Sequence, residues 1–308
     1  FKKNNLMESK IILGTVQLGV DYENNNKNGK PEENDAIEIL KNAANKGINT
    51  VDTSDYYGNS NQLIAKYNKT TNKPFNIITK ISLDEEISGT ELIKFILRKI
   101  EKLNTTHILC LMFHSYENYN KNFNDYISEY EKLKEMNLIK KIGVSVYSNQ
   151  QALSVLHNNN VDIIQIPFNL FDNFNKRGEI IDLAHNKGVE IHVRSIFLQG
   201  LFFVDLNYLH PKLEPLKKYL IKIHDIANQH EISVNSLAIN YAYAQNNIKK
   251  ILMGVDSVNQ LIKNTDSINN KFDKKILNEV NTIDIQEIEL LDPLFWIKKK
   301  IINLHKTS

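Results

Sequence analysis

The chain has 308 residues, of which 38 are Lys or Arg and 36 are Asp or Glu, so its formal net charge is +2. This length allows one large domain with a substantial core, and the balanced charge predicts neither nucleic-acid binding nor a polybasic membrane anchor. The single cysteine, Cys110, cannot form an internal disulfide, and there is no apolar run of about 18 residues to span a membrane. We therefore expect a cytoplasmic protein that binds neither nucleic acid nor membrane; its oligomeric state is not indicated.

Residues 1–9 are polar and begin without Met, so we interpret them as a tail or a remnant outside the fold, and we expect one domain over residues 10–308. Along that domain, short β-branched runs alternate with amphipathic stretches. Helical periodicity is clearest over 34–46, 90–103 and 216–227. Eight runs are apolar enough for strands buried on both faces, namely 11–13, 50–52, 76–80, 107–114, 141–145, 161–166, 189–194 and 250–253.

Eight strands alternating with helices predict an α/β protein with a single closed (β/α)8 TIM barrel, with extra loops and helices at its C-terminal face. Residues 198–214, after the seventh run, are predicted to be a long loop of the kind that covers a site. A doubly wound open sheet is the competing fold. Its usual dinucleotide motif, Gly-x-Gly-x-x-Gly between a strand and a helix, is absent from this sequence.

Polar side chains follow three consecutive predicted strands, at the end of the barrel where active sites lie. Asp52 ends the second strand with Tyr57 shortly after it, Lys80 ends the third, and His114 ends the fourth. Each has a purely structural explanation when taken alone. Together they have a chemical use. A Lys beside the Tyr would lower the pKa of the Tyr hydroxyl from about 10, and an Asp would hold the Lys in place. A His could bind a carbonyl oxygen. This set predicts protonation of a carbonyl oxygen as a hydride reaches the carbon.

The segment over 47–60, Gly-Ile-Asn-Thr-Val-Asp-Thr-Ser-Asp-Tyr-Tyr-Gly-Asn-Ser, resembles the Gly-Ile-Asn-x-x-Asp-Thr-Ala-x-x-Tyr-Gly-x-Ser signature of the aldo-keto reductase family. The resemblance runs from about residue 11 to residue 264. It places the family's catalytic Asp, Tyr, Lys and His on Asp52, Tyr57, Lys80 and His114. The residues over 12–22 and 194–201 further resemble a bacterial branch associated with surface-polysaccharide and sugar pathways.

The resemblance implies an oxidoreductase that binds NAD(P)H without a Rossmann domain. Hydride would pass between the nicotinamide and the carbonyl of a polar aldehyde or ketone, with sugar derivatives among the candidates. Carboxamide contacts are implied for Ser145 and Gln165, a pyrophosphate contact for the stretch after the seventh strand, and adenosine contacts for the loop over 254–264. The implied cofactor-binding set is Ser145, Gln165, Arg194, Ser195, Gln199, Gly200, Gly254, Asp256, Gln260 and Asn264. No metal-binding motif is present, and we expect no metal.

Three departures from the family pattern bear on ligands. Val146 replaces an Asn that would donate to the nicotinamide. Arg194 replaces an aromatic ring that stacks on the nicotinamide; its guanidinium could stack and hold an anionic group, or it could pair with a neighbouring carboxylate. Gly254 and Gln260 stand at two places where relatives offer basic residues to a 2′-phosphate, and the acidic Asp256 lies between them. The family therefore implies NADPH, whereas this loop leaves NADH open.

Two other functions remain open at this point. The barrel could bind a nucleotide as a sensor or scaffold, or it could be a non-reducing sugar-modifying enzyme that uses Arg194 as an anion clamp. The complete set of four catalytic positions favours the reductase, and failure to bind any nicotinamide would favour the sugar-modifying enzyme.

Overall fold

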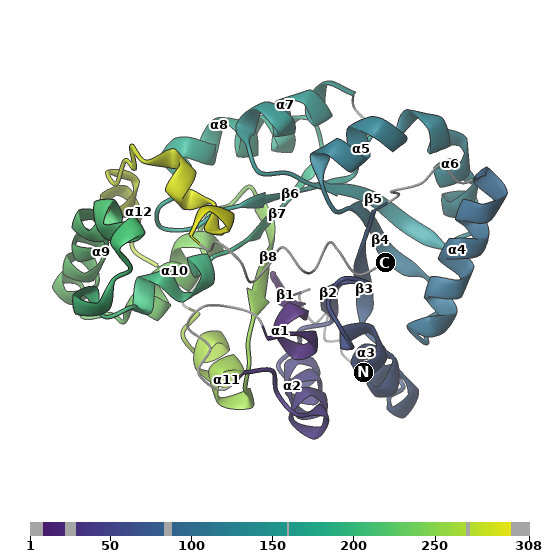
Figure 1. The fold of residues 1–308 in the computed structure, drawn as a ribbon, viewed down its shortest axis with the longest axis horizontal. Helices are drawn as coiled ribbons and strands as arrows, with labels where there is room; N and C mark the ends of the chain where they lie inside the picture. The colour runs from purple at the N-terminus through teal and green to yellow at the C-terminus, as the bar shows by residue number, and fades with distance from the viewer. Residues whose placement is uncertain (1–8, 22–28, 83–87, 159, 269–271, 297–308) are drawn as a thin grey trace, which may run out of the picture.

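The computed structural model describes residues 9–21, 29–82, 88–158, 160–268 and 272–296. Within these residues, eight parallel strands pair in sequence order, and β8 pairs with β1 to close a barrel surrounded by helices (Figure 1). The predicted (β/α)8 barrel is therefore confirmed. Residues 1–8 of the expected tail and 297–308 of the expected domain lie outside the described residues. No helix in the described part of the chain is long and apolar enough to cross a membrane.

The strands and helices alternate as the sequence pattern indicates. The strands are β1 (Ile11–Gly14), β2 (Thr50–Ser54), β3 (Asn76–Ile81), β4 (Ile108–Phe113), β5 (Ile139–Ser145), β6 (Ile163–Pro167), β7 (Glu190–Arg194) and β8 (Ile248–Gly254). The helices are α1 (Val16–Gly19), α2 (Glu33–Asn45), α3 (Ser60–Thr70), α4 (Gly89–Lys102), α5 (Tyr116–Asn122), α6 (Ile127–Glu135), α7 (Asn149–Asn158), α8 (Phe174–Asn186), α9 (Lys217–Gln229), α10 (Val234–Tyr243), α11 (Val258–Asp266) and α12 (Lys274–Asn281).

Every predicted strand forms, and the differences lie at the strand ends. β5 begins at Ile139, two residues before the predicted start, because Ile139 pairs with Ile108 of β4. β8 likewise begins at Ile248, which pairs with Ile191 of β7. The predicted loop over 198–214 contains short 3₁₀ turns and leads into α9. These differences leave the carboxyl end of every strand at the same rim of the barrel.

A small apolar layer fills the inside of the barrel. It is made of residues from four strands, with two of them on β4, namely Ile12, Ile78, Cys110, Met112 and Ile163. Cys110 is fully buried there, and burial raises the pKa of its thiol well above the ordinary value. The larger core lies between the barrel wall and the helices. The layer closes the barrel interior below the mouth.

The amino-terminal end of the barrel holds a charged network. Lys141 Nζ lies 2.7 Å from Glu190 Oε1, and Lys250 Nζ donates to the Ser9 carbonyl at 2.7 Å. His192 is buried, with its Nε2 at 3.4 Å from Glu190 Oε2. The hydrogen bond from His192 lowers the pKa of Glu190 to about 2, and the hydrogen bond and charge of Lys141 act in the same direction. Burial lowers the pKa of His192 although Glu190 opposes this, so the ring is neutral and Nε2 carries its proton.

This network predicts acid sensitivity in two steps. His192 stays neutral in the folded protein while the unfolded chain takes up a proton below pH about 6.5, so stability falls as pH decreases through that value. Glu190 adds a second loss below its ordinary pKa of 4.5 and down to about 2. We expect His192→Gln, whose amide can still donate to Glu190, to reduce the loss between pH 7.5 and 5.5 by on the order of 1 kcal/mol. Urea unfolding at both pH values measures it, and identical pH dependence in the two proteins would contradict the assignment.

Candidate functional site

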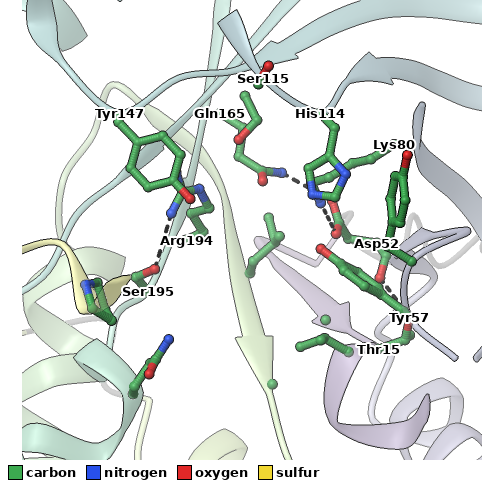
Figure 2. A pocket seen from close by; sticks show the side chains of 18 of the residues that line it. Thr15, Asp52, Tyr57, Lys80, His114, Ser115, Tyr147, Gln165, Arg194 and Ser195 are labelled. Atoms are coloured by element: carbon green, nitrogen blue, oxygen red, sulfur yellow. Dashed lines mark hydrogen bonds and ion pairs between the residues drawn. The ribbon is translucent and has the colours of Figure 1, made fainter. Parts of the chain in front are cut away.

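A cavity of about 680 Å³ opens at the carboxyl ends of the strands. All four residues expected to be catalytic, Asp52, Tyr57, Lys80 and His114, line it. In Figure 2 they lie on one side of the pocket, with Gln165 toward the middle and Tyr147, Arg194 and Ser195 on the other side. The expectation that active-site side chains lie at the carboxyl ends of barrel strands therefore places these four side chains correctly.

The Asp52 carboxylate links three strands at the floor of this cavity. One oxygen forms a buried ion pair with Lys80, and the other accepts a hydrogen bond from Gln165 Nε2 at 3.1 Å. The Asp52 backbone carbonyl accepts from the Thr15 hydroxyl at 2.9 Å. Because each partner comes from a different strand or strand end, Asp52 fixes the relative positions of the groups around it.

Tyr57 is held by its backbone against α1. A Cβ on Gly19 would lie 1.8 Å from the Tyr57 carbonyl oxygen, so only glycine allows this approach. Gly58, with φ of +53°, makes the reciprocal contact with the Gly19 carbonyl. The Tyr57 ring faces Lys80 Nζ at 5.7 Å and meets the His114 ring edge-on with centroids 6.2 Å apart. Both expected partners of Tyr57 are thus beside its ring.

The pKa of Tyr57 moves in the opposite direction from the one expected. Burial raises it, the Asp52 carboxylate raises it further, and the charge of Arg194 opposes both. Lys80, whose charge is paired with Asp52, does not offset this rise. Tyr57 therefore carries its proton throughout the neutral range, as a general acid must.

A second ion pair, which the sequence did not indicate, anchors the loop that carries Tyr57. Lys99 of α4 is buried and its ammonium lies 2.6 Å from Asp55 Oδ2. Asn61 Nδ2 donates to the other Asp55 oxygen at 2.9 Å. Asp55 precedes Tyr57 by two residues, so these contacts restrain the loop from outside the cavity. A buried lysine on an amphipathic helix could have signalled such a partner.

The residues expected to bind the cofactor are distributed over two cavities. Ser145, Gln165, Arg194, Ser195 and Gln199 line the large cavity. Gly200, Asp256, Gln260 and Asn264 line a second cavity of about 170 Å³, and Gly254 lines both. Gln17 and Phe197, which the sequence analysis missed, also line both. The two cavities therefore adjoin, and the expected residues follow one elongated path.

The segment after β7 has an unusual backbone along this path. Ser195, Leu198 and Gln199 have φ values of +61°, +46° and +50°, a region that residues other than glycine rarely adopt. Gly200 follows with φ of +79°. Such clusters of left-handed residues occur where a ligand requires a particular backbone shape.

The two residues expected to bind the carboxamide of the nicotinamide lie side by side in the barrel. Gln165 is fully buried, and its Nε2 donates to Asp52. Its Oε1 has no hydrogen-bond partner in the described structure. Ser145 is buried beside it across the β5 to β6 pairing. A free acceptor and a hydroxyl suit the amide nitrogen and oxygen of a carboxamide. The residues present therefore fit a nicotinamide.

Arg194 has a partner that the sequence did not predict. Its Cζ lies 4.3 Å from the centre of the Tyr147 ring (Figure 2). Nη2 donates to the Val146 carbonyl at 3.3 Å, and no carboxylate in the described part of the chain forms an ion pair with Arg194. The alternative of a structural ion pair is thus not observed. Tyr147 lies just beyond the carboxyl end of β5, so a search of the strand ends for site residues could have found it.

A closed parallel barrel with polar side chains gathered at the carboxyl ends of its strands defines a (β/α)8 barrel enzyme. The model of the aldo/keto reductase family matches residues 10–285, and the chain belongs to this family. It is an NAD(P)H-dependent oxidoreductase.

Individual relatives are distant. YqkF of Bacillus subtilis, an uncharacterized oxidoreductase, is 22% identical over 85% of this chain and 87% of its own length. L-galactose dehydrogenase of Arabidopsis thaliana is 25% identical over 94% of each chain. The holo form of the aldo-keto reductase AKR11C1 from Bacillus halodurans has a TM-score of 0.71 and 18% identity, covering 91% of this chain and 94% of that one.

The contact between Gly19 and Tyr57 gives a test of the site geometry. We expect Gly19→Ala to displace the Tyr57 backbone, lower kcat by at least about 10-fold and destabilise the fold by about 1–3 kcal/mol. Steady-state kinetics and urea unfolding measure the two effects. Gly14→Ala is the stability control, because a Cβ there would lie 3.6 Å from its nearest neighbour. Equal stability of the two variants, with normal turnover in both, would show that the close approach is unimportant.

Proposed function

We propose that the protein reduces a polar aldehyde or ketone with NADH, in the cytoplasm, and that sugar derivatives are among its substrates. The observation that carries the proposal is Tyr57, a protonated hydroxyl beside Lys80 and His114 at the wall of the large cavity. The similarity to L-galactose dehydrogenase supports a sugar substrate. The single buried thiol, Cys110, suits a reducing compartment.

The proposed mechanism assigns one task to each side chain. When bound, the reduced nicotinamide supplies the hydride that forms the new C–H bond. The Tyr57 hydroxyl donates its proton to the carbonyl oxygen, which becomes the alcohol. His114 orients that oxygen, and Lys80 stabilises the phenolate that remains until a proton from solvent restores it. Asp52 holds Lys80 in place and acts through it.

The proposed cofactor path runs from Gln165 and Ser145, at the carboxamide, through the segment after β7 to the second cavity. There Phe197 and Phe203 pack with ring centroids 5.7 Å apart, and both offer apolar surface to a purine. The Asn235 side-chain nitrogen, which lacks a partner in the described structure, lines the same cavity. Among the described lining residues the only charged side chain is Asp256, which favours a ribose hydroxyl over a 2′-phosphate.

The role of Tyr57 can be tested by removing its hydroxyl. We expect Tyr57→Phe to lower kcat about 100- to 10,000-fold while changing NADH affinity only a few-fold, because the hydroxyl transfers a proton and does not hold the dinucleotide. Lys80→Met should be at least as damaging. Single-turnover kinetics and fluorescence titration with NADH separate chemistry from binding. Near-normal turnover of Tyr57→Phe would exclude it as the acid, and binding of neither NADH nor NADPH to the unmodified protein would exclude the proposed reductase.

The cofactor preference has its own test. Replacing Asp256 by Ser and Gln260 by Arg removes one negative charge and adds one positive charge at the second cavity. We expect the ratio of kcat/KM for NADPH to that for NADH to rise at least about 10-fold. Asp256→Asn alone, which removes the charge and keeps the shape, should produce part of the change. If the unmodified protein already prefers NADPH strongly, then the assignment of this loop is wrong and another basic residue binds the phosphate.

A further inference from the structure

Arg194 is a cation at the cavity that the mechanism leaves unused. It is the last residue of β7, half-buried, and lines the large cavity. A guanidinium has five N–H donors. The contacts of this one are two long hydrogen bonds, at 3.4 Å to the Ser195 hydroxyl and 3.3 Å to the Val146 carbonyl. Because a partly desolvated cation without a counter-ion is unfavourable, an anion that reached Arg194 would be bound tightly.

Tyr147 fixes the direction in which Arg194 offers its donors. Arg194 Cζ lies over the Tyr147 ring, 4.3 Å from its centre, and Nη2 donates to the Val146 carbonyl. Both residues belong to the segment after β5, two strands from β7, so the guanidinium is restrained from outside its own strand. A planar fork restrained by a ring contact and a hydrogen bond is suited to bidentate binding of a carboxylate or phosphate.

The other cations at the cavity are placed differently. Lys80 is buried in its ion pair with Asp52. Lys121 is exposed on α5, at a rim that also carries the carboxylates of Glu117 and Asp292. Screening by water and salt weakens such rim charges. Of the described residues that line the cavity, Arg194 is thus the cation that is sheltered and not balanced by a carboxylate. Its charge is also felt at Tyr57, where it acts against the rise in pKa.

We propose that Arg194, held by Tyr147, binds an anionic group of the carbonyl substrate, so that the preferred substrates are aldehydes or ketones carrying a carboxylate or phosphate. The inference rests on the proposed function, because it names the substrate class of the same site. The pyrophosphate of the cofactor has similar chemistry, and the experiment must distinguish the two sources.

The kinetic arm compares matched anionic and neutral aldehydes at saturating NADH. The pairs are 4-carboxybenzaldehyde with methyl 4-formylbenzoate, and glyceraldehyde 3-phosphate with glyceraldehyde. We expect the unmodified protein to favour the anionic member of at least one pair by kcat/KM, and Arg194→Met to reduce that ratio about 10- to 100-fold. Arg194→Lys keeps the charge without the fork and should recover little of the ratio. Using a ratio at saturating cofactor cancels any effect on NADH binding.

Three further variants separate anion binding by the restrained Arg194 from general electrostatics. Tyr147→Ala should lower the anionic-to-neutral ratio, and Tyr147→Phe, which keeps the ring, should restore it. Lys121→Met removes a rim charge from the same cavity and should change the ratio less than about 2-fold. An equal effect of Lys121→Met and Arg194→Met would contradict the proposal. Thermal denaturation of every variant identifies those that fail to fold, and Arg194→Lys then carries the comparison.

The binding arm does not depend on turnover. Calorimetric titration of 4-(hydroxymethyl)benzoate and its methyl ester, with and without NADH, should show tighter binding of the anion that is lost in Arg194→Met. No anion preference in either arm, or weakened NADH binding with the anion preference intact, would overturn the proposal; the latter result assigns Arg194 to the cofactor pyrophosphate. Arg194-dependent anion binding without reduction of any aldehyde would support the anion site and contradict the proposed reaction.

Discussion

The buried carboxylate of Asp52 is the interaction on which the geometry of the cavity depends. It pairs with Lys80 of β3, accepts from Gln165 of β6 and, through its backbone, ties the turn after β1 to β2. Breaking a buried ion pair by removing one partner costs about 3–5 kcal/mol, because the remaining charge is left without compensation. The positions of Lys80 and Gln165 are therefore coupled, although they act on different ligands in the proposed reaction.

The same pairing explains the distribution of charge around the cavity. Lys80 lies close to Tyr57, yet its charge is paired with Asp52. Burial and the Asp52 carboxylate therefore raise the pKa of the Tyr57 phenol, and the charge of Arg194 opposes them. Arg194 is not balanced in this way among the described residues. One cation thus belongs to the framework of the site, and the other remains available to a ligand.

The sequence predicts the barrel well because strands buried on both faces appear as short apolar runs, which are local patterns. It also predicts that Asp52, Lys80 and His114 meet, since parallel strands end at one rim. It does not predict the contact of Arg194 with Tyr147, because the two side chains come from strands separated by β6. The predicted lowering of the Tyr57 pKa is wrong for a related reason. The sequence shows that a lysine is near, but it does not show that the lysine is already paired.

Several strands of the barrel carry residues of two unrelated sites. β5 carries Lys141 and then Ser145, β7 carries His192 and then Arg194, and β8 carries Lys250 and then Gly254. The first member of each pair belongs to the charged network at one end of the barrel, and the second reaches the cavity at the other. Tolerance to acid and choice of ligand can therefore evolve, or be engineered, independently within the same strand.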